Sequence, residues 1–259
     1  MSRSIPAPTS AVNDLQDKTV YGIMSSMSSP FLTAAWRDLL LLNWRVDRSL
    51  LLPQVPVGTE LDSWEGGYYV SLVGFRFLDL SVKGLPAVGH RDFPEINLRF
   101  YVRREVDGEI RRGVVFIFEL TPRRIVEWVA RAVYNEPYKT LPMRGEVSEE
   151  QTQYELQQAG QWQGMAARPT GEWHEPADEA RETFFVEHYW GYNKKSNGDT
   201  MEYEVTHPIW RTRDADLACF DLDVGLLYEP KWAEALAGEP DVVVLAEGSE
   251  VTVFSGKRI

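Results

Sequence analysis

Short apolar runs separated by turn residues recur along almost the whole chain, and this spacing constrains the fold more than any other feature of the sequence. After residue 143, runs of about 5 to 10 residues follow one another between Gly, Pro, Asn and Asp, a length and punctuation typical of β-strands. Only a few segments, chiefly 122–135 and 230–238, carry helical patterns. The sequence therefore predicts a mostly β (α+β) protein in which an antiparallel β-barrel, closed or nearly closed, has helices at its flanks.

The stretch 93–143 is where neighbouring local signals agree best. It reads as strand, Asp-Gly turn, strand and helix, followed by a proline-bounded loop that carries Tyr138 and Lys139. Thr121 followed by Pro122 predicts the start of the helix, as N-cap and first helical residue. Alternation along the first strand predicts two faces. Ile96, Leu98, Phe100 and Val102 are expected to face the core, and Asn97, Arg99, Tyr101 and Arg103 to face outward.

The segment 31–46 contains four consecutive leucines and leaves two interpretations open. It is either a fully buried strand or a short helix, because periodicity alone does not separate the two. Asp47 is expected to cap a single helical turn that Pro53 ends.

Two later predicted strands carry charged residues among apolar and aromatic neighbours. A hairpin turn at Glu65-Gly66-Gly67 opens the strand that carries Arg76, which is either an edge charge reaching solvent or a buried anchor for an anion. Residues 183–195 read as a strand with Glu187 and Tyr189 on one face. Glu187 is interpreted either as a structural carboxylate paired with an arginine or as a pocket residue whose pKa burial raises.

The acidity of the chain bears on its partners and its compartment. With 27 basic and 39 acidic residues the net charge is −12, which repels phosphate backbones and anionic lipids. We therefore expect neither a nucleic-acid nor a membrane partner. Cys219 is the only cysteine, so no internal disulfide forms, and its apolar neighbours predict a buried thiol. The first residues lack the apolar run of a secretory signal, and we expect a soluble cytoplasmic protein.

Residues 1–28, rich in Ser, Pro and small residues, are predicted to be a flexible N-terminal arm. The remainder, 29–259, shows no repeat and no break in composition, which predicts one domain. Phosphate-binding, nucleophile-elbow and zinc-protease motifs are absent from the sequence. The four histidines are scattered, without the spacing of metal ligands, so we expect no metal and no cofactor.

The proline-bounded loop holds the strongest candidates for chemistry. Lys139 is either a surface lysine on a connector or, held among apolar neighbours, a base or imine-forming nucleophile with a lowered pKa. Glu95 and Tyr138 supply an acid and a phenol in the same stretch of sequence, so the three side chains form a candidate catalytic group.

Several motifs together resemble the YqjF-like family of uncharacterised bacterial proteins, over about residues 30–259. They are WRDLLLLNW (36–44), FPEINLRFYV (93–102), the F-x-x-E-x-Y pattern (184–189) and HPIW (207–210). That family is similar in fold to acetoacetate decarboxylase, which implies a cone-like antiparallel β-barrel with an internal pocket. The decarboxylase has a glutamate ahead of a strand, which Glu95 resembles, and a proline followed by two lysines, the first of which forms the Schiff base. Here Pro137-Tyr138-Lys139 resembles that loop.

The resemblance implies that Tyr138 occupies the Schiff-base position and that Lys139 is the second lysine, whereas a one-residue shift of the loop makes Lys139 the nucleophile. We therefore expect an internal pocket that binds a small carboxylate- or carbonyl-bearing molecule without covalent chemistry. Its expected lining is Glu95, Tyr138, Lys139, Arg76, Glu187 and Tyr189. The alternative is a lyase resembling the decarboxylase, acting on keto acids, with Lys139 as imine former or base and Glu95 as acid or base. A homo-oligomer is compatible with either function.

Overall fold

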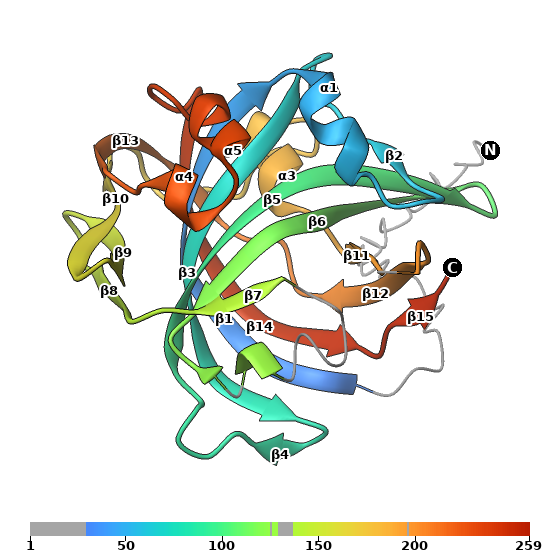
Figure 1. The fold of residues 1–259 in the computed structure, drawn as a ribbon, viewed down its shortest axis with the longest axis horizontal. Coiled ribbons are helices and arrows are strands. Elements are labelled where there is room, and N and C mark those ends of the chain that lie inside the picture. The colour runs from blue at the N-terminus through green and yellow to red at the C-terminus, as the bar shows by residue number, and fades with distance from the viewer. Residues whose placement is uncertain (1–29, 125, 129–136, 196) are drawn as a thin grey trace, which may run out of the picture.

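The computed structural model describes residues 30–124, 126–128, 137–195 and 197–259 (Figure 1). Within these ranges the protein is mostly β, with its strands joined in one 15-stranded sheet and only short helices. The strands are β1 (Pro30–Val46), β2 (Glu60–Leu61), β3 (Tyr68–Val82), β4 (Leu85–Pro86), β5 (Phe93–Val106), β6 (Glu109–Thr121), β7 (Tyr138–Thr140), β8 (Met143–Val147), β9 (Thr152–Gln158), β10 (Gln161–Pro169), β11 (Trp190–Lys194), β12 (Thr200–Thr206), β13 (Thr212–Phe220), β14 (Val242–Phe254) and β15 (Lys257–Arg258). The helices are α1 (Arg48–Leu51), the 3₁₀ turn η1 (Leu52–Gln54), α3 (Arg181–Val186), α4 (Val224–Leu227) and α5 (Pro230–Ala235).

Strand pairing runs in a closed circuit, which we call the ring: β12, β11, β6, β5, β3, β1 and β14, with β14 pairing back to β12. Six of these junctions are antiparallel, as the sequence predicted. The junction of β6 with β11 is parallel, contrary to that prediction. An odd number of strands cannot alternate in direction all the way round a ring, so a ring of seven requires at least one parallel pair.

Both faces of the ring strands β1, β3 and β5 are buried. Their outer face packs against β9, β10, α4 and α5, which lie along one side of the ring (Figure 1). Segment 31–46, left open between strand and helix, is the strand β1, and its leucines are buried on both sides. Leu40 and Leu42 belong to the apolar cluster on the outer face of the ring, and Leu39 and Leu41 belong to the apolar cluster on its inner face. A strand buried on both faces reads as a continuous apolar run, which explains the four leucines.

The predicted faces of β5 need a correction. Ile96 and Leu98 face the outer cluster as expected, but Asn97 and Arg99 on the opposite face are buried as well. Alternation was correct, whereas the assignment of one face to solvent was wrong. Only Arg103, near the end of the strand, is exposed as predicted.

The helical turn capped by Asp47 is confirmed, since the Asp47 carboxylate accepts from the backbone N–H of Ser49 at 2.7 Å. The turn at residues 65–67 forms, but the pairing beside it is limited to an isolated bridge between Trp64 and Gly67. The preceding strand β2 pairs with β5 rather than with β3. The hairpin predicted at this turn is therefore wrong, because β3 does not pair with the strand that precedes the turn.

The strand predicted for residues 183–195 begins only at β11, because the residues before it form α3. The aromatic side chains of α3 explain this difference: Phe184 and Phe185 pack against Tyr69 and Tyr101 on the inner face of the ring, with ring centroids 4.9 to 6.1 Å apart. The helix predicted from Pro122 lies mostly outside the described residues, as does the N-terminal arm 1–28.

Cys219 is exposed, contrary to the predicted buried thiol, on the strand β13 that extends the sheet beyond the ring. The C-terminal helix predicted at 230–238 is confirmed as α5. No helix in the described part of the chain has both the length and the apolarity needed to cross a membrane.

The parallel junction of the ring depends on a glycine, which gives a first prediction. A Cβ added to Gly113 would lie 2.5 Å from the carbonyl oxygen of Trp190 in the paired strand and 2.7 Å from the ring of Tyr192. We expect Gly113→Ala to lower the free energy of unfolding by about 1–3 kcal/mol, the usual cost of overpacking. Urea denaturation measures this loss.

Gly171→Ala is the matched control, because a Cβ there would meet its neighbours only at ordinary contact distances of 3.6 Å or more. Equal stability of the two variants would contradict the steric role of Gly113.

Candidate functional site

A cavity of about 400 Å³ lies inside the ring, and every ring strand contributes to its wall. Most of the lining is apolar, and aromatic side chains are frequent in it. The aromatic lining residues are Phe31, Trp36, Phe75, Phe77, Phe93, Phe116, Tyr138, Trp190, Tyr203 and Trp210. The polar ones among the described residues are His90, Glu95, Asn97, Arg99, Glu119, Tyr138, His188, Tyr203 and His207. A concave, mainly apolar cavity with a few convergent polar groups is the usual form of a small-molecule site.

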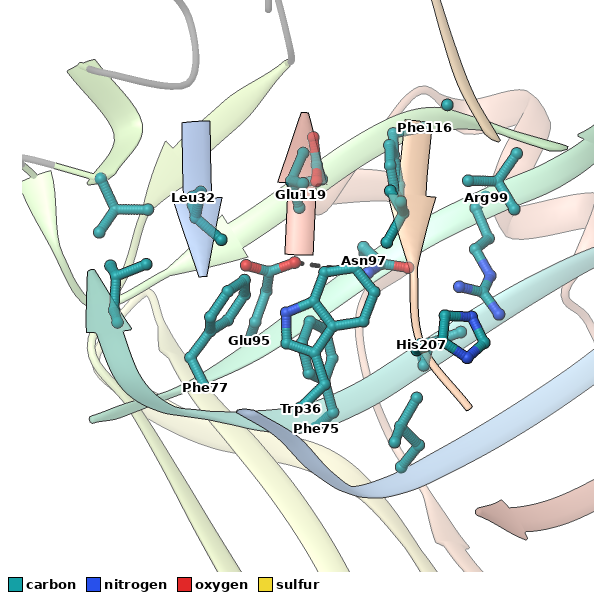
Figure 2. A pocket seen from close by; sticks show the side chains of 18 of the residues that line it. Leu32, Trp36, Phe75, Phe77, Glu95, Asn97, Arg99, Phe116, Glu119 and His207 are labelled. Carbon is teal, nitrogen blue, oxygen red and sulfur yellow. Dashed lines mark hydrogen bonds between the residues drawn. The ribbon is translucent and has the colours of Figure 1, made fainter. Parts of the chain in front are cut away.

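Three polar side chains of β5 point into this cavity in a row. Glu95, Asn97 and Arg99 are two residues apart and so share the inner face of the strand, as Figure 2 shows. Glu119 of β6, directly opposite Asn97 in the strand pairing, adds a second carboxylate. All four side chains are buried, with Arg99 at 9% exposure the most accessible.

Glu95 and Tyr138, an acid and a phenol predicted to meet, are in contact. The hydroxyl of Tyr138 on β7 donates to Glu95 Oε2 at 2.8 Å. Asn97 Nδ2 donates to the other oxygen, Glu95 Oε1, at 3.4 Å. Both carboxylate oxygens of Glu95 therefore accept a hydrogen bond from a neighbouring side chain.

Lys139, expected beside Glu95 and Tyr138, lies on the other side of β7. Side chains alternate along a strand, so the buried Tyr138 points into the cavity while Lys139 is exposed and does not line it. The imine route predicted as the alternative depended on Lys139, and this position removes that support.

No lysine lines the cavity within the described part of the chain. Six of the seven lysines of the sequence are described there, and each is at least partly exposed: Lys83, Lys139, Lys194, Lys195, Lys231 and Lys257. Among the described residues, no three His, Cys, Asp or Glu side chains gather closely enough to hold a metal ion.

Arg76, expected in the pocket or at an edge, also lies outside the cavity lining. It forms an ion pair with Asp38 of β1, and its Nε donates to the Asp38 carboxylate at 2.7 Å. Asp38 adopts a positive φ of 57° at an irregularity in the pairing of β1 with β3, a geometry typical of a β-bulge. The bulge aims the carboxylate at Arg76, so the charge of this arginine is already balanced.

Glu187 and Tyr189 contact one another but do not line the cavity. Burial raises the pKa of Glu187, although the hydrogen bond from Tyr189 opposes that rise. Tyr189 stacks on His207, with ring centroids 4.8 Å apart, and His207 does line the cavity. Glu187 and Tyr189, which were predicted to bind the ligand, therefore lie outside the cavity wall, and Tyr189 packs against a residue that forms it.

Arg99, like Glu119, is a charged group of the cavity that the sequence prediction missed. Its Nη2 donates to the backbone carbonyl of Phe185 at 3.0 Å, and its guanidinium lies 5.9 Å from the ring centre of Tyr101. Within the described residues no carboxylate forms an ion pair with Arg99, and its Nε has no hydrogen-bond partner. Arginine remains protonated in proteins, so this side chain is a buried positive charge.

His188 and His207 lie near Arg99 in the wall of the cavity, and sequence reasoning missed their meeting too. The ring of His188 packs on Tyr101, with centroids 4.7 Å apart, and neither ring nitrogen has a hydrogen-bond partner among the described residues. Burial, followed by the charges of Arg99, Arg112 and His207, lowers the pKa of His188 well below its ordinary value. Burial lowers the pKa of His207 as well.

The lowered pKa of His188 makes the stability of the fold depend on pH. In the unfolded chain a histidine binds its proton near pH 6.5, whereas folded His188 resists protonation. The unfolded state therefore binds more protons as the pH falls below about 6.5, and the free energy of unfolding decreases. We expect His188→Phe, which keeps a ring beside Tyr101, to lose less stability than the wild type between about pH 7.5 and about pH 5.

Urea denaturation across this pH range measures the effect. His174→Phe is the matched control, since His174 is exposed, and it should retain the wild-type slope. An unchanged slope in the His188 variant would show that the buried ring does not resist protonation.

Sequence comparison identifies the family. A family model, DUF2071, described as an uncharacterized conserved protein, matches residues 33–250, and the chain belongs to this family. The uncharacterized protein YqjF of Bacillus subtilis (strain 168) is 34% identical over 112 residues, which are 43% of this chain. That match spans 45% of the length of YqjF, less than half of the relative.

Comparison with solved structures identifies the fold. An acetoacetate decarboxylase from Legionella pneumophila is similar with a TM-score of 0.63 and 16% identity, over 90% of this chain and 88% of that one. The enduracididine biosynthesis enzyme MppR, solved in complex with pyruvate, has a TM-score of 0.61 and 14% identity over 90% and 92% of the two chains. An acetoacetate decarboxylase-like enzyme from Sphingomonas wittichii RW1 has a TM-score of 0.60 and 11% identity, over 89% and 94%. The protein therefore has a mostly β fold similar to that of acetoacetate decarboxylase.

Proposed function

We propose that this DUF2071 protein binds a small organic carboxylate, without covalent chemistry, in the cavity of its ring. Arg99 is the counter-ion of the ligand in this proposal. The observation that carries it is the buried guanidinium of Arg99, which lines the cavity and has no carboxylate partner among the described residues.

The energetics of a buried charge favour a ligand anion at this position. Removing an unpaired charge from water costs several kcal/mol, and contacts with neutral groups recover only part of that cost. For Arg99 those groups are the Phe185 carbonyl and the ring of Tyr101. A ligand carboxylate supplies the missing negative charge and matches the fork of guanidinium N–H donors.

The neutral ring of His188 suits the same carboxylate. Both of its ring nitrogens lack hydrogen-bond partners within the described residues. A neutral imidazole carries one N–H, which can donate a hydrogen bond to a carboxylate oxygen. A nearby anion also favours the protonated ring, so ligand binding is expected to raise the lowered pKa of His188. Arg99 and His188 together are the proposed anion subsite.

The structural relatives support a small carboxylate as the ligand. MppR, whose overall fold is similar, was solved in complex with pyruvate, which carries a carboxylate. We take the ring of this chain to be a cone-like barrel of the same type, with residues 29–259 as one domain and the interior as the ligand site. The chemistry differs in this proposal, because Lys139 is exposed and the cavity side of β7 presents Tyr138 instead.

We place this binding function in the cytoplasm, in keeping with the single cysteine of the chain. No nucleic-acid partner is proposed, because the net charge of −12 opposes one. A homo-oligomer remains compatible with the proposal, and light scattering on the purified protein measures that state.

Arg99→Met tests the proposed counter-ion. A panel of pyruvate, benzoate and octanoate is titrated against the protein, with the fluorescence of Trp36, Trp190 and Trp210 in the cavity wall as the signal. We expect at least one acid to bind the wild type, and its Kd to rise about tenfold or more in the variant, since hydrogen bonds to charged groups contribute about 1.5–3 kcal/mol. The melting temperature should stay equal or rise, because the substitution removes an uncompensated buried charge.

Arg76→Met is the matched control, since it removes an arginine whose charge Asp38 already balances outside the cavity. Its Kd for the same acid should equal that of the wild type. Failure of all three acids to bind, or equal affinity in the Arg99 variant, would contradict the proposed function.

Borohydride trapping tests the absence of imine chemistry. Treating the protein with pyruvate and borohydride reduces any imine to a stable amine, which intact-mass spectrometry detects. We expect no added mass, because no described lysine faces the cavity. An adduct that peptide mapping places on Lys139 and that is lost in Lys139→Gln would overturn the non-covalent proposal.

A further inference from the structure

We infer that the ligand is an amphiphilic carboxylate, with an apolar body equal in volume to about two aromatic rings or a medium-length alkyl chain. This inference rests on the proposed function, which supplies the carboxylate, and adds the chemistry of the rest of the molecule. It separates this chain from a site built for a compact keto acid such as pyruvate.

The distribution of polarity in the cavity is the first observation. Arg99 and His207 lie toward one side of the row along β5, and Leu32 and Phe77 toward the other, as Figure 2 shows. Trp36 and Phe75 lie between these two groups in the same view, with their rings 5.7 Å apart. A ligand whose carboxylate reaches Arg99 therefore has the aromatic rings of Trp36 and Phe75 along its length, and it also passes the polar side chains of Glu95 and Asn97 in the same row.

The volume of the cavity is the second observation. An apolar cavity of about 150 Å³ is enough to bind benzene, and this one measures about 400 Å³. A molecule the size of pyruvate would leave most of the aromatic wall without contacts, and those dispersion contacts contribute to affinity only when they are made. A larger apolar body fills the space.

The entrance is the third observation. Val88, after β4, lines the cavity and is 84% exposed, so the cavity opens to solvent beside it. Leu85 in β4 is also exposed, and Ala87 lines the wall between them. The rim beside Val88 thus offers apolar contact to the end of the ligand that is remote from Arg99.

A chain-length series tests this inference. Straight-chain acids from acetate to decanoate are titrated against the protein by calorimetry, with 1-octanol as the uncharged comparison for octanoate. Burial of each methylene contributes about 0.8 kcal/mol, so the Kd should fall by up to about fourfold per added methylene until the cavity is full. Octanol should bind at least tenfold more weakly than octanoate, because it brings no charge to Arg99.

Phe116→Trp tests whether the chain occupies the cavity. Phe116 lines the cavity opposite Arg99, and a larger ring there reduces the space. The affinity gained per methylene should end at a shorter chain in this variant. Phe118→Trp is the matched control, since Phe118 packs on Tyr228 on the outer side of β6 and should leave the series unchanged.

The outcomes separate this inference from the proposed function. Binding of short and long acids with equal affinity, sensitive to Arg99→Met, would overturn the amphiphile and leave the carboxylate site intact. A length dependence that Phe118→Trp shifts as much as Phe116→Trp would also overturn it. Binding of no acid at any length would overturn both proposals.

Discussion

The pairing of β14 with β12 closes the ring, and the cavity depends on this contact. Val205 and Thr206 pair there with Val253 and Thr252, so the sheet closes on itself and encloses an interior. A ring of seven strands cannot be antiparallel throughout, and the parallel pair of β6 with β11 satisfies that requirement. The close approach of Gly113 to Trp190 in this pair shows why a side chain is excluded at that position.

Because both faces of the ring strands are buried, an apolar cluster forms on the outer face and the wall of a cavity on the inner face. The outer face packs against β9, β10, α4 and α5 in one apolar cluster, which includes Leu72 and Leu98 of the ring and Trp232 of α5, all fully buried. Clusters of this kind contribute most of the hydrophobic stabilisation of a domain. The inner face can then hold groups that destabilise a fold, including the unpaired charge of Arg99 and the His188 ring without hydrogen-bond partners among the described residues. Uncompensated polar groups in a cavity wall are what a ligand with the opposite chemistry would complement.

The similarity to acetoacetate decarboxylase is a similarity of fold. The side chains that line the cavity are known from this chain alone. Side-chain alternation along β7 places Tyr138 against Glu95 and turns Lys139 outward, so two of the three predicted partners meet. A low sequence identity of 16% to the Legionella enzyme is compatible with a shared fold and with different chemistry, because function resides in the site rather than the architecture.

Local patterns by themselves determined the mostly β class, the alternation along β5, the cap at Asp47 and the family resemblance. They did not decide whether either face of β5 is solvated, because alternation specifies two faces but not what covers them. Only the closed ring and its outer layer show that Asn97 and Arg99 are inside. The same limit applies to His188 and His207, which are distant from Arg99 in sequence and meet it only through the packing of α3 and the ring. Burial and charge pairing are properties of the whole fold, so the grouping of Arg99, His188 and His207 in one cavity wall could be found only in the tertiary structure.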